Sequence, residues 1–192
     1  MSGVLAQLSR ESIEFQSRSI FKQLLDHPKY KQARRLAIYL STDREVDTIE
    51  LVKHSLEVEG KKCYVPYVRP TGRTGAGPRM QMVELSSMSQ YEKLKLNRYG
   101  IKEPDEHLAR RQQSLNANDV EDLLILVPGV AFSSDGRRLG HGKGYYDEYL
   151  NYLASNGERT PFAIGLALRE QIVADPMAIE GLDYKLDEVL TG

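Results

Sequence analysis

The apolar segment "LLILVPG" at residues 123–129 constrains the fold of this chain most strongly. A short, continuous apolar run of this kind is typical of a strand that is buried on both faces of a parallel sheet. Further segments with strand character occur at residues 34–41, 61–68, 80–85, 162–168 and 185–192. Because segments with helical periodicity alternate with these strands, the sequence predicts a three-layer α/β domain with a mostly parallel sheet.

The predicted helices lie between these strands. Apolar residues recur at three- and four-residue spacing from residue 9 to residue 27, which predicts an amphipathic helix. Asp47 stands three residues before Glu50, which is typical of a capping box at a helix start, and Gly60 would close that helix in the left-handed conformation. Another helix is expected from residue 147 to residue 154.

Length, charge and cysteine usage exclude several classes of protein. The 192 residues fit one domain, and a formal net charge of -1 favours neither nucleic acid nor an anionic membrane as a partner. Cys63 is the only cysteine, so an intramolecular disulfide and a thiolate zinc site are both excluded. No apolar run approaches the ~20 residues needed to span a bilayer, and no signal peptide precedes the first helix. A cytoplasmic location is therefore expected.

The stretch "GRRLGHGKGYYDEYL" at residues 136–150 carries the chemistry. It connects the end of a buried strand to a helix, and ligands of α/β sheets bind beyond the carboxyl ends of the strands. Three alternating glycines leave the backbone open to an anion, Lys143 supplies a point charge suited to phosphate, and Asp147 can hold magnesium. Tyr145 and Tyr146 offer flat faces to a planar ring.

The pattern differs from two familiar phosphate-binding motifs. Gly144 follows Lys143 where a Walker A loop has Ser or Thr, and the glycine spacing departs from the dinucleotide-binding fingerprint. An alternative without chemistry is a glycine-rich hairpin whose turn is "SSDG" at residues 133–136 and whose tyrosines belong to the core. Lys143 and Asp147 together favour phosphate binding over that alternative.

The same stretch resembles the signature loop of the 5-formyltetrahydrofolate cyclo-ligases, also called 5,10-methenyltetrahydrofolate synthetases. The segments "IYLSTDREVDT", "CYVPYV", "MQMVEL", "LLILVPGVAF", "FAIGLALREQI" and "KLDEVL" resemble further blocks of that family in the same order. The resemblance implies an α/β fold related to ribose-phosphate isomerases and CoA transferases. It also implies an enzyme that converts 5-formyltetrahydrofolate and MgATP to 5,10-methenyltetrahydrofolate, ADP and phosphate. Apart from the resemblance, a monomer is expected. A phosphorylated formyl group, an iminium phosphate, would be the intermediate.

The resemblance also implies roles for individual residues, with Lys143 and Arg138 as the catalytic pair. The implied ATP-binding residues are Arg138, Leu139, Gly140, His141, Gly142, Lys143, Gly144, Tyr145 and Tyr146. The implied folate-binding residues are Leu40, Glu45, His141, Gly142, Lys143, Gly144 and Tyr145. Asp147 and Asp183 match the metal ligands of the family, and Asp187 is the competing second ligand.

Several of these residues have plainer alternatives. Leu40 can be a core residue, Glu45 a solvated loop charge and Asp183 a turn residue before the last strand. Tyr99 falls near a position where relatives have an aromatic ring, so stacking on folate and ordinary packing are both open.

Two features depart from the family pattern. His141 stands where the animal loop has arginine, which would adjust the charge beside the phosphates. The family's N-terminal helix, which carries a Lys-x-x-x-Arg pair, is expected to be missing from this single domain of residues 1–192, although Arg10 and Arg18 could replace the pair in part. An impaired, truncated isoform that binds folate or nucleotide is therefore the alternative to an active enzyme. A sugar-phosphate-binding domain of the same fold is disfavoured by the ordered blocks.

Overall fold

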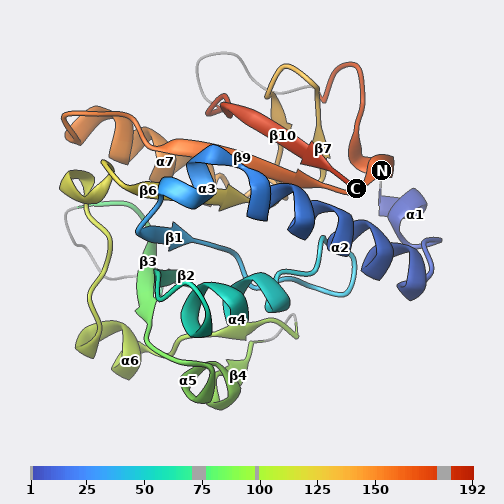
Figure 1. Cartoon of the computed structure of the whole chain (residues 1–192). Coiled ribbons are helices and arrows are strands. Elements are labelled where there is room, and N and C mark those ends of the chain that lie inside the picture. The colour runs from blue at the N-terminus through green and yellow to red at the C-terminus, as the bar shows by residue number, and fades with distance from the viewer. Residues whose placement is uncertain (1, 71–76, 98–99, 177–182) are drawn as a thin grey trace.

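A central sheet organises the computed structural model, which describes residues 2–70, 77–97, 100–176 and 183–192. The sheet has six strands in the order β10-β9-β6-β1-β2-β3 (Figure 1). β3 runs antiparallel to β2, and the other neighbouring pairs are parallel. Its strands are β1 (Arg35–Ala37), β2 (Lys62–Val68), β3 (Met80–Leu85), β6 (Leu123–Val127), β9 (Phe162–Ala167) and β10 (Glu188–Thr191). The prediction of a mostly parallel sheet is confirmed.

Helices cover both faces of this sheet, as Figure 1 shows. α2 (Arg10–Asp26), α3 (Pro28–Gln32) and α4 (Ile49–Glu57) lie on one face, and α7 (Tyr145–Asn156) lies on the other. The shorter elements are α1 (Ser2–Leu5), α5 (Met88–Lys93), α6 (Glu106–Arg111), η1 (Ala117–Asp119), η2 (Arg169–Gln171) and the two-residue strands β4 (Lys95–Leu96), β5 (Lys102–Glu103), β7 (Ala131–Phe132) and β8 (Arg138–Leu139). None of the described helices combines the length and apolar character that crossing a bilayer requires.

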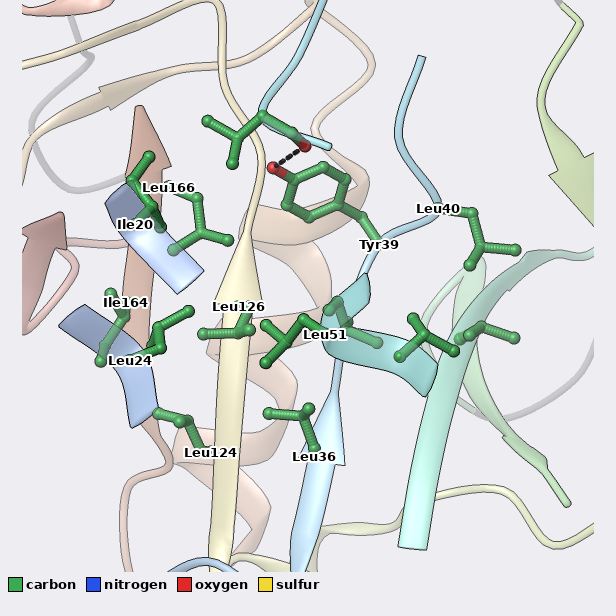
Figure 2. Close-up of a cluster of buried hydrophobic side chains, with 14 of the residues drawn as sticks. Ile20, Leu24, Leu36, Tyr39, Leu40, Leu51, Leu124, Leu126, Ile164 and Leu166 are labelled. Atoms are coloured by element: carbon green, nitrogen blue, oxygen red, sulfur yellow. Dashed lines mark hydrogen bonds between the residues drawn. The ribbon is translucent and has the colours of Figure 1, made fainter. Parts of the chain in front are cut away.

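The larger apolar core lies between the sheet and the helices α2 and α4. Figure 2 shows Ile20 and Leu24 of α2 against strand residues such as Ile164, with Leu51 of α4 packed farther along the sheet. Fully burying a side chain of this size contributes about 1.5–3 kcal/mol. The hydroxyl of Tyr39 donates to the carbonyl of Val46 at 3.1 Å, so the chain beyond β1 is tied to this core. The three- and four-residue spacing of residues 9–27 therefore predicted the correct buried face.

A second core lies on the opposite face, under α7. Ile125 and Val127 of β6 pack there against Leu150 and Leu153 of α7. Successive residues of a strand point to opposite faces, so both faces of β6 are covered and all five of its residues are buried. This double burial is the physical reason for the continuous apolar run at residues 123–127. Cys63 in β2 is also fully buried, and burial raises the pKa of its thiol to about 12.

Some local predictions were wrong in detail. The strand expected at residues 34–41 has only the three residues of β1, although Ile38 still donates to the carbonyl of Tyr64 at 2.9 Å. The predicted capping box is absent, because α4 begins after Thr48, which makes no side-chain cap. Asp47 instead accepts a hydrogen bond from the backbone N–H of Ile49 at 3.0 Å. The helix predicted at residues 147–154 is longer, since α7 extends from Tyr145 to Asn156.

Candidate active site

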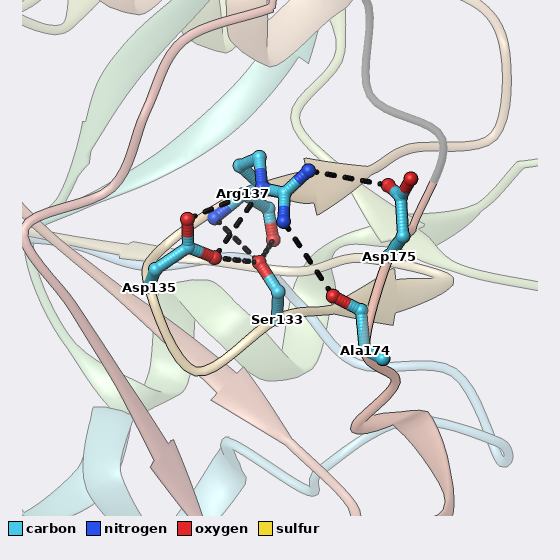
Figure 3. A network of polar contacts seen from close by, with 5 residues as sticks. All are labelled: Ser133, Asp135, Arg137, Ala174 and Asp175. Atoms are coloured by element: carbon cyan, nitrogen blue, oxygen red, sulfur yellow. Dashed lines mark hydrogen bonds and ion pairs between the residues drawn. The ribbon is translucent and has the colours of Figure 1, made fainter.

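A short hairpin leads from β6 into the glycine-rich stretch. β7 pairs with β8 in antiparallel fashion, and the turn between them is the "SSDG" segment at residues 133–136. Figure 3 shows the polar network of this turn, in which Arg137 contacts Asp135 at 3.2 Å and Asp175 at 3.3 Å. Gly136 has φ of 90°, and a Cβ there would lie 2.2 Å from the carbonyl oxygen of Leu186. The glycine-rich hairpin of the alternative without chemistry is therefore confirmed, with "SSDG" as its turn. Residues 140–144 follow this hairpin and are not part of it.

The segment from Gly140 to Gly144 follows the hairpin and precedes α7. His141, Gly142, Lys143 and Gly144 are all exposed. Gly142 has φ of 78° and Gly144 has φ of 66°, a region that glycine adopts without strain, so Lys143 lies between two left-handed residues. Gly144 is the N-cap of α7 and supplies no capping side chain. The first N–H groups of α7 therefore remain available for an anion, next to the Lys143 ammonium group.

Arg138 lies beneath this exposed segment and not on it. Its side chain is 4% exposed, and Nη2 donates to Oδ1 of Asp147 at 2.7 Å. Nη1 donates to the carbonyl oxygen of Pro128 at 3.3 Å, just beyond the end of β6. The guanidinium group thus ties the end of β6 to the first turn of α7. A contact between Arg138 and the phosphates of ATP stays a prediction.

The carboxylate of Asp147 also receives a hydrogen bond from the C-terminal part of the chain. The backbone N–H of Tyr184 donates to Oδ1 of Asp147 at 3.2 Å, which brings the neighbouring Asp183 close to the start of α7. The competing ligand Asp187 lies elsewhere, because it accepts a hydrogen bond from the N–H of Ala163 in β9 at 2.8 Å. The backbone next to Asp183 is therefore bonded to Asp147, whereas the side chain of Asp187 is bonded to β9.

Binding of a magnesium ion, shared with a nucleotide, by Asp147 and Asp183 stays a prediction. Within the described residues, three or more His, Cys, Asp or Glu side chains nowhere gather around one point. Magnesium does not require such a cage, because it usually takes one or two carboxylates together with phosphate oxygens and water. Asp147 and Asp183 match that ligand set, whereas zinc would need more protein ligands.

Glu45 lies close enough to Tyr146 for its charge to act on the tyrosine hydroxyl. The carboxylate of Glu45 accepts a hydrogen bond from the N–H of Thr42 at 2.8 Å. Burial and, second, the negative charge of Glu45 raise the pKa of Tyr146 well above its ordinary value. The Tyr146 hydroxyl is buried without a hydrogen-bond partner in the described part of the chain, and Arg138 lies 5.9 Å from its ring. An unpaired buried hydroxyl is a candidate contact for a bound substrate.

The remaining predicted site residues occupy plainer positions. Leu40 is 7% exposed and belongs to the larger core, which agrees with the alternative that it is a core residue. Its contact with folate stays a prediction. Leu139 is part of β8, and Tyr145 is half-buried at the start of α7. Tyr99 lies outside the described residues.

Sequence reasoning missed Arg79 and Glu148, which hold the exposed segment from the side. The Arg79 guanidinium bonds to the Glu148 carboxylate at 2.6 Å and to the Lys143 carbonyl at 3.0 Å. Arg79 precedes β3 and is far from the glycine-rich stretch in sequence, so no periodicity or spacing could connect the two. The run "YYDEYL" contains Glu148, but it does not identify the partner.

Two cavities of the described structure lie away from the glycine-rich stretch. One of about 380 Å³ is lined by residues of α5, β4 and α6, including Lys93, Lys95 and His107. The other, of about 290 Å³, lies at the amino ends of β1 and β2 beside Arg35 and Lys62. Residues 141–144 are exposed, which suits a site that is completed by its ligands.

Known proteins resemble this chain over nearly its whole length. The model of the 5-formyltetrahydrofolate cyclo-ligase family matches residues 1–192. A probable 5-formyltetrahydrofolate cyclo-ligase of Caenorhabditis elegans is 34% identical over 191 residues, which cover 99% of this chain and 88% of the relative. The 5-formyltetrahydrofolate cyclo-ligase of Mus musculus is 33% identical over 186 residues, with 97% and 87% of the two chains covered.

A solved structure extends the comparison. The NMR structure of Aquifex aeolicus 5,10-methenyltetrahydrofolate synthetase has a TM-score of 0.70 and 28% sequence identity, covering 98% of this chain and 85% of that chain. This likeness agrees with the α/β fold described above. The chain therefore belongs to the 5-formyltetrahydrofolate cyclo-ligase family of enzymes.

Proposed function

We propose that this protein converts 5-formyltetrahydrofolate to 5,10-methenyltetrahydrofolate with ATP and magnesium, through a phosphorylated formyl group. The observation that carries the proposal is the exposed Lys143 between Gly142 and Gly144, directly before the uncapped start of α7. In a chain whose family acts on 5-formyltetrahydrofolate, this cationic surface suits the phosphates of a nucleotide. The alternative of an impaired folate- or nucleotide-binding isoform is not favoured, since the family match covers residues 1–192.

The reaction needs an activated formyl oxygen, because the oxygen of an amide is a poor leaving group. In the proposed first step, the formyl oxygen attacks the γ-phosphorus of ATP, and the bond to the β–γ bridging oxygen breaks to release ADP. In the second step, N10 of the folate attacks the formyl carbon and gives up its proton to the departing phosphate, while the carbon–oxygen bond breaks to release that phosphate. No protein nucleophile takes part, so the protein contributes positioning and charge neutralisation.

The residues are proposed to divide this work between the phosphates of ATP and the pterin ring of the folate. Lys143 would neutralise negative charge on the transferred phosphoryl group, together with the N–H groups at the start of α7. Asp147 and Asp183 would hold magnesium, which supplies positive charge to the phosphate oxygens. Glu45 and the unpaired hydroxyl of Tyr146 are proposed to face the pterin ring, where a carboxylate can accept hydrogen bonds from N–H donors.

We expect the purified protein to form methenyltetrahydrofolate only when ATP and a divalent cation are both present. Product formation is followed by its near-ultraviolet absorbance, with parallel reactions that omit ATP, contain a chelator, or contain an ATP analogue that cannot transfer its γ-phosphoryl group. Equal turnover without ATP would contradict the phosphorylated intermediate. Folate binding by calorimetry without turnover in any reaction would support the binding-protein alternative instead.

Two matched variants test whether Asp183 or Asp187 is the second metal ligand. We expect Asp183→Asn to raise the magnesium concentration needed for half-maximal rate about tenfold, because a charged oxygen ligand is lost beside Asp147. Asp187→Asn makes the same chemical change four residues later and should leave the magnesium requirement near that of the wild type. Titration of the rate with magnesium measures both. The assignment is wrong if Asp187→Asn shows the larger shift.

A further inference from the structure

Arg79 connects the residue before β3 to Lys143 of the exposed glycine segment and to the first turn of α7. Its Nη2 atom donates to the carbonyl oxygen of Lys143 at 3.0 Å, and its Nε atom donates to Oε2 of Glu148 at 2.6 Å. The backbone N–H of Arg79 donates to Oε1 of the same carboxylate at 2.9 Å. Glu148 belongs to the first turn of α7, so one side chain holds the residue before Gly144 and the helix after it.

The segment that Arg79 reaches has little else to fix its conformation. In the part of the chain that the structure describes, no other hydrogen bond joins residues 140–143 to the rest of the protein. A Cβ added at Gly142 would meet no atom within 4 Å, so packing does not restrain that residue either. Glycine has more conformational freedom than any other residue, and Gly142 and Gly144 flank Lys143. The contact with Arg79 is therefore the main restraint on the backbone of Lys143.

The charge of Arg79 is already balanced by the contacts that it makes. Glu148 accepts two hydrogen bonds from Arg79, at 2.6 Å from Nε and 2.9 Å from the backbone N–H, so the guanidinium charge lies directly against a carboxylate. The guanidinium group also lies 5.0 Å from the centre of the Tyr145 ring. A cation that is paired with a carboxylate and an aromatic ring is suited to hold neighbouring groups in place, whereas Lys143 carries the charge that remains available for an anion.

We propose that Arg79 is a positioning residue, which fixes the peptide at Lys143 and so orients the Lys143 ammonium group toward the transferred phosphoryl group. The inference rests on the proposed ATP-dependent function and adds a residue from a distant part of the sequence to that site. It requires the fork geometry of a guanidinium group, because one side chain must donate to the Lys143 carbonyl and the Glu148 carboxylate at the same time.

The test compares Arg79→Met, Arg79→Lys and the control Arg110→Met. Arg110 is also an exposed arginine paired with a glutamate, at 2.6 Å from Glu106 on α6, so its replacement removes the same charge away from the site. We expect Arg79→Met to lower kcat/KM for ATP at least tenfold while KM for 5-formyltetrahydrofolate stays within about twofold. Arg79→Lys keeps the charge but not the fork, so it should recover little of the loss.

A second measurement does not depend on turnover. Hydrogen exchange of the amides at residues 140–144 should be faster in Arg79→Met than in the wild type or in Arg110→Met. If exchange and kinetics of Arg79→Met match those of Arg110→Met, or if Arg79→Lys is fully active, the positioning role is overturned. A wild-type protein without ATP-dependent turnover would refute the proposed function alone, because the exchange experiment would still decide whether Arg79 holds the loop.

Discussion

Replacing Arg138 by methionine is expected to lower the free energy of unfolding by about 3–5 kcal/mol. The side chain of Arg138 is 4% exposed and that of Asp147 is 13% exposed, so the substitution would leave a carboxylate inside the protein without its cation. Removing one partner of a buried ion pair is far more damaging than removing both. Denaturation by urea, followed by circular dichroism, measures the change.

Two companion variants make this first prediction specific. Arg137→Met removes the neighbouring arginine, whose side chain is 42% exposed, and should lower stability by less than about 1 kcal/mol. Adding Asp147→Asn to Arg138→Met should restore part of the lost stability, because the amide oxygen of asparagine can still accept from the N–H of Tyr184. If Arg137→Met and Arg138→Met are equally stable, the buried pair does not hold the site together.

Lys143→Met is expected to act on turnover and not on the fold. Lys143 is exposed, and its ammonium group has no partner in the described part of the chain, so stability should stay within about 0.5 kcal/mol of the wild type. Loss of one preorganised donor to a developing charge lowers kcat about 10²–10³-fold, and we expect a fall of that size in kcat/KM for ATP. Folate affinity, measured by calorimetry, should be nearly unchanged.

The control for this variant is Lys95→Met, an exposed lysine of β4 outside the site. Steady-state kinetics of the two variants at varied ATP and varied folate separates the roles. A loss of folate affinity in Lys143→Met, with normal use of ATP, would contradict the phosphate role and show that Lys143 binds folate.

The sequence predicted the layers of the fold because the burial of each strand and helix determines which of its neighbouring residues are apolar. A strand covered on both faces is apolar at every position, as at residues 123–127, and a helix covered on one face repeats its apolar residues at three- and four-residue spacing, as in α2. The ends of elements were less predictable. Asp47 and Glu50 match a capping box, yet α4 begins one residue later because Asp47 caps the backbone of Ile49 in a different way.

The candidate site was predictable as a stretch of residues but not as a set of contacts. The glycines, Lys143 and Asp147 stand close together in sequence, so their types and spacing indicate phosphate and metal chemistry. The partners of these residues come from distant segments: Tyr184 for Asp147, and Arg79 for Lys143. A hydrogen bond between segments that meet only in the folded chain leaves no periodic signal in the sequence. Arg138 is a second example. Its residue type suggests a contact with phosphate, but only the structure shows that its side chain is buried.

The strand order has a consequence for how the sheet grows during synthesis. β1 comes first along the chain but lies in the middle of the sheet, between β2 and β6. One side of the sheet, β1 to β3, is complete when Leu85 has been made, whereas the other edge of β1 has no partner until β6 emerges with Leu123. Unpaired strand edges invite pairing with other chains. The nascent chain is therefore most exposed to wrong association between these two points, before β6, β9 and β10 extend the sheet outward in turn.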